Sequence, residues 1–115
     1  MVERARMGKG YSIYRRGSKT TEAPRFVDCS SFVKWLYSKV WVWIPRRSIQ
    51  QREFGKRIEL REAEAGDLIF ASGKNSYYTN DPEDDVSHVG MLTGEGTVVH
   101  AKNSDEHVVE CPTDQ

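Results

Sequence analysis

DCSSFV at residues 28–33 begins the segment that decides the fold of this chain. Asp28 is a residue type that caps helix N-termini. The apolar residues that follow recur at helical spacing, at Phe32, Val33, Leu36, Tyr37 and Val40. The pattern predicts a helix with Cys29 in its first turn, on the stripe that packs inward. A thiol in this position lies at the positive end of the helix dipole.

Strands are predicted downstream of this helix. They are KRIEL at 56–60, DLIFA at 67–71, VSHVGML at 86–92, TVVHA at 97–101 and HVVE at 107–110. A second, short helix is predicted at 48–55, where Gly55 ends it. Residues 1–27 are interrupted by glycines and Pro24, so loops with at most one short helix are expected there, and residues 1–10 are expected to be irregular. Helices followed by strands predict an α+β fold with an antiparallel sheet.

The chain of 115 residues has the size of one domain, so a single domain over residues 1–115 is predicted. It lacks a run of about 18 apolar residues, which a membrane span needs, and its N-terminus lacks the apolar core of a secretory signal. Residues 1–61 carry 15 Lys or Arg against 5 Asp or Glu, whereas residues 62–115 carry 2 against 12. Oppositely charged halves that fold against each other explain this division better than nucleic-acid binding does.

Three residues offer the chemistry of a nucleophilic cysteine site. Cys29 has the helix N-terminus, and His88 and His100 lie on consecutive predicted strands. If the Gly-Glu-Gly turn between these strands is a three-residue loop centred on Glu95, His100 lies opposite Gly90, and His88 lies diagonally on the same face. A two-residue turn would place the histidines on opposite faces. On one face, His88 can take the thiol proton while His100 binds the far ring nitrogen and fixes the tautomer.

Each of these residues also has a plainer interpretation. A cysteine at the start of a buried helix is more often inert than catalytic, and a lone histidine is more often structural. His107, among acidic residues, is expected on the surface. A disulfide between Cys29 and Cys111 would exclude a catalytic Cys29. Metal binding by Cys29, His88 and His100 is a further alternative, but no HExxH or paired-cysteine spacing supports it, so no metal is predicted.

Five short motifs distinguish these interpretations. They are DCSSFV at 28–33, IPRRSIQQ at 44–51, AGDLIF at 65–70, SHVGM at 87–91 and VVHA at 98–101. With these motifs in this order, the chain resembles the NlpC-type family of cell-wall cysteine endopeptidases over about residues 8–110. The resemblance implies a papain-like fold, in which N-terminal helices, one of them carrying the cysteine, pack on an antiparallel sheet that carries the histidines. The Cys, His, His order excludes permuted relatives in which the histidine comes first.

The resemblance also implies roles for individual residues. Cys29 matches the nucleophile, His88 the general base, and His100 the polar residue that orients the base. Tyr11 in GKGYSIY resembles the family tyrosine that lies beside the thiol and helps to hold the oxyanion, although the glycine pair that normally follows is missing.

Substrate contacts are expected around the nucleophile. Asp28 and Ser30 match the positions where the family shapes its substrate pocket, although a helix cap and a first-turn residue explain them equally well. Arg46 is expected to pair with carboxylates of the substrate, against the more common outcome of a solvated surface arginine. The acidic loop at 72–85 is expected to border the cleft.

Members of the family usually cleave the bond between D-glutamate and the diamino residue of peptidoglycan stem peptides, through a thioester and without a cofactor. The resemblance thus implies a cysteine peptidase that acts on bacterial cell-wall peptide and is secreted, wall-associated or delivered by a phage. Two rivals remain: another papain-like amidase or acyltransferase, and a catalytically inactive wall-binding module. No sequence feature bears on oligomeric state, and a monomer is expected.

Overall fold

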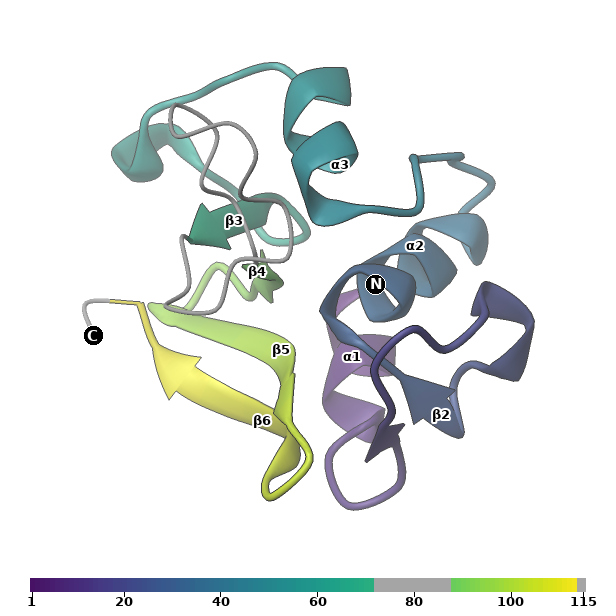
Figure 1. The fold of residues 1–115 in the computed structure, drawn as a ribbon. Coiled ribbons are helices and arrows are strands. Elements are labelled where there is room, and N and C mark those ends of the chain that lie inside the picture. Colours follow the sequence, from purple (N-terminus) through teal and green to yellow (C-terminus); the bar gives the residue numbers. More distant parts are fainter. Residues whose placement is uncertain (72–87, 114–115) are drawn as a thin grey trace.

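A computed structural model describes residues 1–71 and 88–113 of the chain (Figure 1). Its elements are, in order, α1 (Val2–Met7), β1 (Ile13–Tyr14), η1 (Thr20–Glu22), β2 (Phe26–Val27), α2 (Cys29–Ser38), α3 (Ser48–Phe54), η2 (Leu60–Glu62), β3 (Leu68–Ala71), β4 (His88–Leu92), β5 (Thr97–Asn103) and β6 (His107–Pro112), where η denotes a 3₁₀ turn. The expected loop at 72–85 lies outside the described residues, as do Val86 and Ser87 of the predicted strand at 86–92.

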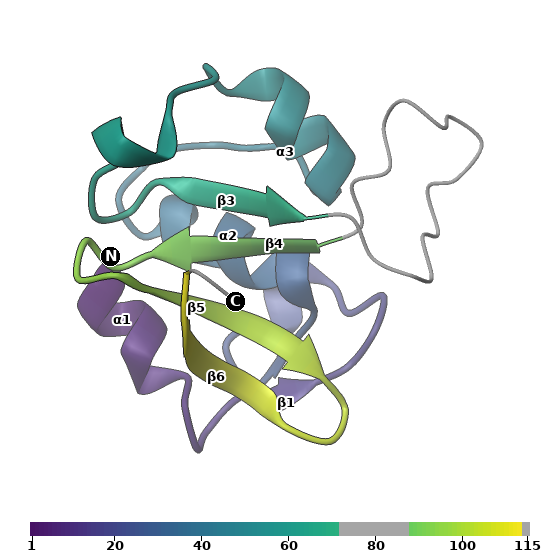
Figure 2. The same ribbon diagram turned by 90° about the vertical axis from the view of Figure 1, so that its left-hand side faces the viewer.

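Strands β3 to β6 form one antiparallel sheet in sequential order. Helix α2 packs against β4 and β5, and Figure 2 shows it behind these strands, with α1 at one end of the sheet and α3 beyond β3. The predicted antiparallel sheet after the helices is confirmed, although β1 and β2, which the sequence did not predict, form a short parallel pair before α2. The sheet and α2 together are the frame that positions the cysteine and the histidines.

The core lies between α2 and the sheet. Phe32 and Leu36 of α2 are fully buried and belong to one cluster with Met91 of β4 and Val99 of β5. Burying each side chain of this size stabilises the fold by about 1.5–3 kcal/mol relative to leaving it in water. The helix ends at Ser38, so Val40, the last residue of the expected stripe, lies beyond it and is exposed.

The predicted strand at 56–60 is wrong. Residues 56–59 have no regular structure, and Leu60 begins the 3₁₀ turn η2. The alternating apolar side chains of this segment meet no buried face, since Ile58 is 44% and Leu60 58% exposed. A strand needs both a paired neighbour and a face to bury, and the alternation in the sequence supplies neither.

The N-terminal segment is more ordered than the sequence indicated. The short helix allowed within residues 1–27 is α1, at Val2–Met7, so residues 1–10 are not irregular throughout, and Ala5 is fully buried in the main core. Arg6 and Lys9 both bind Glu110 of β6, with N···O distances of 3.1 and 2.9 Å. These contacts fasten the start of the chain to the last strand of the sheet.

His107 is not a plain surface residue, so that expectation is also wrong. Its ring is partly buried, and its Nδ1 atom accepts a hydrogen bond of 3.0 Å from the backbone N–H of Tyr14. Its backbone has φ 58°, in the left-handed region. His107 therefore joins the start of β6 to strand β1.

Candidate active site

Asp28 fixes the start of the helix that carries the cysteine. Its carboxylate accepts a hydrogen bond of 2.8 Å from the backbone N–H of Ser31, and the Ser31 hydroxyl accepts one of 2.9 Å from the N–H of Asp28. This reciprocal cap makes Cys29 the first residue of α2. The thiol thus has the helix N-terminus that the sequence predicted, where the dipole favours a negative charge.

Cys29 packs against strand β4. It is 7% exposed and clusters with Val33, Ile44 and Val89. The backbone N–H groups of Val89 and Ser30 favour the thiolate, so the sulfur lies against the residue that follows His88. Both cysteines are free thiols, and the alternative of a disulfide between Cys29 and Cys111 is wrong.

The two histidines meet on one face of the sheet. Met91 pairs with Val99, and Leu92 pairs with Val98, which is the register predicted for a loop centred on Glu95. As a result, the Nε2 atom of His88 lies 2.6 Å from the Nδ1 atom of His100. This hydrogen bond engages Nε2 of His88, so a further partner of this ring would meet Nδ1.

Gly90 permits this close approach of the histidines. A Cβ atom on Gly90 would lie 2.6 Å from Cγ2 of Val98 and 3.0 Å from Cβ of His100. Any side chain at this position of β4 would therefore displace β5 and the ring of His100. The glycine of the SHVGM motif thus has a steric role in the histidine pair.

Burial keeps the Cys29 thiol and the His88 imidazole neutral. Desolvation, followed by the charge of Asp28, raises the pKa of the Cys29 thiol to about 11. Desolvation, followed by the neighbouring His100, lowers the pKa of His88 to about 4. At neutral pH the site therefore holds a thiol beside an unprotonated imidazole, which is the form of His88 that can act as a base.

The free energy of unfolding is expected to fall as the pH falls from about 6.5 to 4. In this interval the unfolded chain binds a proton at residue 88, whose unfolded pKa is 6.5, whereas the folded chain does not, so protons favour unfolding. The loss from His88 amounts to about 3 kcal/mol at the acidic end. Thermal melts at stepped pH check this, and His88→Asn should show a flatter profile between these pH values. Parallel profiles for the two proteins would contradict the assignment.

The three expected substrate-binding residues bind one another in the structure. Arg46 donates to Oδ2 of Asp28 at 2.7 Å, to the Ser30 hydroxyl at 2.7 Å and to the carbonyl oxygen of Ser18 at 2.6 Å. Burial alone would raise the pKa of Asp28, but its bonds to Arg46, Ser31 and Gly17 outweigh burial, and the pKa is lowered. This network holds the first turn of α2, next to the nucleophile, and a role in substrate binding stays a prediction.

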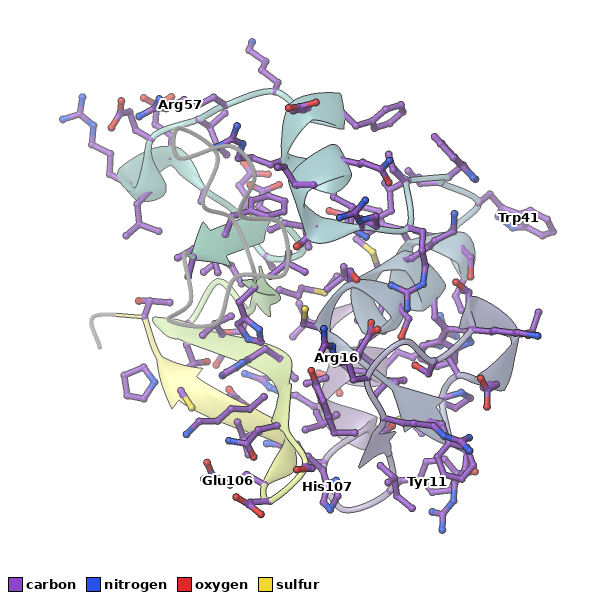
Figure 3. The ribbon with its side chains drawn as sticks, in the orientation of Figure 1. Tyr11, Arg16, Trp41, Arg57, Glu106 and His107 are labelled. Atoms are coloured by element: carbon purple, nitrogen blue, oxygen red, sulfur yellow. The ribbon has the colours of Figure 1, made fainter. Side chains whose placement is uncertain are left out.

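Tyr11 is not brought to the cysteine. It lies in the turn that follows α1, is 50% exposed, and its ring lies 5.2 Å from the guanidinium of Arg25 (Figure 3). Tyr14 of β1 lies nearer to the start of α2, because it pairs with Val27, two residues before Cys29. The expected position of Tyr11 beside the thiol does not fit this structure.

Gln51 is a site residue for which the sequence predicted no role. It is 3% exposed, and its Nε2 atom donates to the carbonyl oxygens of Ser30, at 3.1 Å, and Pro45, at 2.8 Å. Gln51 thereby joins α3 to the first turn of α2. The only signal for it was its place in the IPRRSIQQ motif.

Within residues 1–71 and 88–113, no three His, Cys, Asp or Glu side chains form a group that could hold a metal ion. The helix-borne thiol and the histidine pair on an antiparallel sheet define a papain-like domain. The NlpC/P60 family model matches residues 11–114, and the chain belongs to this family.

Known relatives agree with this assignment. The chain is 36% identical over 81 residues to the "Probable endopeptidase Cgl2188" of Corynebacterium glutamicum, covering 70% of this chain and 34% of the relative. It is 34% identical over 77 residues to the "Bifunctional muramidase/DL-endopeptidase CwlT" of Bacillus subtilis, covering 67% and 22%. The chain thus spans a third or less of the length of these relatives.

Among solved structures, the NlpC/p60 domain of the peptidoglycan hydrolase SagA superposes with a TM-score of 0.78 at 29% sequence identity. The match covers 98% of this chain and 86% of the SagA chain. The predicted papain-like α+β fold is confirmed by this likeness.

Proposed function

We propose that the chain is a cysteine peptidase that hydrolyses an amide bond in peptidoglycan stem peptides, between D-glutamate and the diamino residue. The observation that carries the proposal is the thiol of Cys29 at the start of α2, packed against Val89 of β4, the residue that follows His88 of the hydrogen-bonded pair His88–His100. The family supports a peptidase, and the names of the two relatives, one of them a DL-endopeptidase, support the kind of bond.

The reaction begins with transfer of the thiol proton from Cys29 to Nδ1 of His88 as the sulfur attacks the amide carbon. The backbone N–H of Cys29, at the N-terminus of α2, donates to the oxyanion that this attack forms. His88 then returns the proton to the nitrogen of the leaving amine, the carbon–nitrogen bond breaks, and a thioester remains. A water molecule that gives its proton to His88 hydrolyses the thioester and releases the carboxylate.

His100 serves as the positioning residue in this sequence. Its 2.6 Å hydrogen bond to Nε2 of His88 orients the ring, and donation from that Nε2 leaves Nδ1 unprotonated for the thiol. No step requires a metal or an organic cofactor. The proposed partner is bacterial cell-wall peptide, and the proposed location is outside the cell or in the wall.

The experiment follows a synthetic stem peptide during incubation with the protein. Mass spectrometry should detect two fragments separated at the D-glutamyl bond and, after an acid quench, the acyl fragment attached to Cys29. Cleavage of a different amide or ester would replace the proposal with another amidase or acyltransferase. Some NlpC/P60 proteins are non-catalytic, and retention on purified wall without any fragments would place this chain with them.

A further inference from the structure

An exposed cationic and aromatic surface lies at the far end of α2 from the nucleophile. Its apolar members are Val40, Trp41, Val42 and Trp43, in the loop after α2, and Phe54 at the end of α3. Trp41 is 95% and Trp43 63% exposed. Figure 3 shows Trp41 pointing away from the body of the molecule. Exposed aromatic groups of this size are uncommon on soluble domains and indicate a binding surface.

Ring contacts give part of this surface a defined arrangement. The rings of Trp43 and Phe54 pack edge to face with their centroids 5.4 Å apart. The ammonium group of Lys34 lies 4.8 Å from the centroid of Trp43. Lys39, at the end of α2, lies in the same way 5.6 Å from the centroid of Trp35. Cations are therefore interleaved with the aromatic rings.

The segment that forms this surface is strongly basic. Residues 34–57 contain seven Lys or Arg residues and a single acidic residue, Glu53. Of the seven, Arg46 is engaged by Asp28 in the network below the nucleophile. Lys34 lies over the exposed ring of Trp43, and Lys39 ends α2 next to Val40, so the surface is complementary to a partner that is both anionic and apolar.

We propose that this cationic and aromatic surface docks on an anionic phospholipid bilayer. Tryptophan side chains favour the boundary between lipid headgroups and acyl chains, and lysine or arginine residues next to them attract anionic headgroups. Val40 and Val42 add exposed aliphatic groups, whose transfer from water into the bilayer is favourable. The surface thus combines the two contributions that peripheral membrane binding requires.

Two other occupants fit the observations less well. A sugar ring stacks on a free aromatic face, but the ammonium group of Lys34 lies over the ring of Trp43 and Phe54 packs edge to face with it, and exposed valines add nothing to stacking. A second copy of the chain, docked through the same surface about a two-fold axis, would bring lysine and arginine residues against one another. An anionic bilayer matches both properties of the surface, because its headgroups attract the lysine residues and its acyl chains accept the apolar side chains.

Docking here leaves the proposed active site accessible. Cys29 begins α2 and is 7% exposed, whereas Val40 and Trp41 follow the other end of this helix, about 15 Å along its axis. Binding to lipid is therefore independent of the chemistry at Cys29. A variant without that thiol should bind vesicles as the wild type does, and failure of the proposed peptidase activity would leave this proposal intact.

The experiment measures binding of the purified chain to vesicles of phosphatidylcholine, with and without about one-third phosphatidylglycerol. We expect binding only with the anionic lipid, a blue shift of tryptophan emission on binding, and weakening by added salt. Replacing both Trp41 and Trp43 with alanine should weaken binding by at least about 10-fold. Lys34→Glu with Lys39→Glu should weaken it by about as much.

The matched control is Ile58→Ala with Leu60→Ala, because these apolar side chains are 44% and 58% exposed but belong to the segment around η2, outside the cationic and aromatic surface. This variant should bind anionic vesicles like the wild type, and circular dichroism should show that all the variants fold. Equal binding of the tryptophan variant would overturn the proposal. So would the absence of vesicle binding, whether the chain then bound only wall polymers or formed dimers through Trp41 and Trp43.

Discussion

Cys29→Ala is expected to reduce the rate of stem-peptide cleavage by at least about 10⁴-fold, because no other group in the proposed mechanism can form the thioester. The His88–His100 hydrogen bond remains in this variant, but His88 has no thiol from which to take a proton. The melting temperature should change little, since alanine removes a single heavy atom, the sulfur, from this buried position. Steady-state cleavage rates and a thermal melt measure the two effects separately.

Cys111 provides the matched control for this experiment. It is the other free thiol, lies on β6 and is partly exposed. Cys111→Ala should cleave stem peptides at the wild-type rate. If Cys29→Ala retained activity, or if the two cysteine substitutions were equally harmful, the thioester mechanism would have to be abandoned.

Arg46→Met is expected to destabilise the fold by about 2–3 kcal/mol and lower the Tm by roughly 10 °C. The substitution leaves the carboxylate of Asp28, which is 8% exposed, without its charged partner in a buried setting. The expected loss lies below the range for fully buried pairs, because the Arg46 side chain is 32% exposed. Cleavage should fall as well, since Arg46 also binds the Ser30 hydroxyl next to the nucleophile.

Arg15→Met is the matched control, because Arg15 forms an ion pair of 2.9 Å with Glu22 but is 57% exposed. Its cost should stay below about 1 kcal/mol. The difference in stability between wild type and Arg46→Met should also shrink in strong acid. The pKa of Asp28 is lowered in the folded protein, so the ion pair contributes above the ordinary aspartate pKa and its contribution disappears as Asp28 becomes protonated. A constant difference at every pH would contradict a role for this ion pair.

The sequence predicted those features that follow from local rules. The Asp28 cap and the apolar spacing after it located α2, because a helix start and its buried stripe are encoded within a dozen residues. The turn centred on Glu95 predicted the histidine pair, because the register of an antiparallel hairpin follows from its loop length. Both predictions needed no information from distant parts of the chain.

The features that the sequence missed depend on distant contacts. Arg46 reaches Asp28 across 18 positions, and Gln51 reaches Ser30 across 21, so no local pattern could reveal either bond. Residues 56–60 alternate like a strand, but the sheet offers them no partner. The position of Tyr11 beside the thiol was expected only from its resemblance to the family tyrosine. Residues 1–27 have no periodicity that distinguishes one tyrosine from another.

The contacts between the N-terminal segment and β6 also limit when the proposed active site can form during synthesis of the chain. The bonds from Arg6 to Glu110 and from Tyr14 to His107 span 104 and 93 positions. Contacts of such high sequence separation form late in folding. The ribosome also translates Cys29 before it reaches His88 and His100. Until its last strands have been made, the nascent chain carries the Cys29 thiol without the histidine that would take its proton.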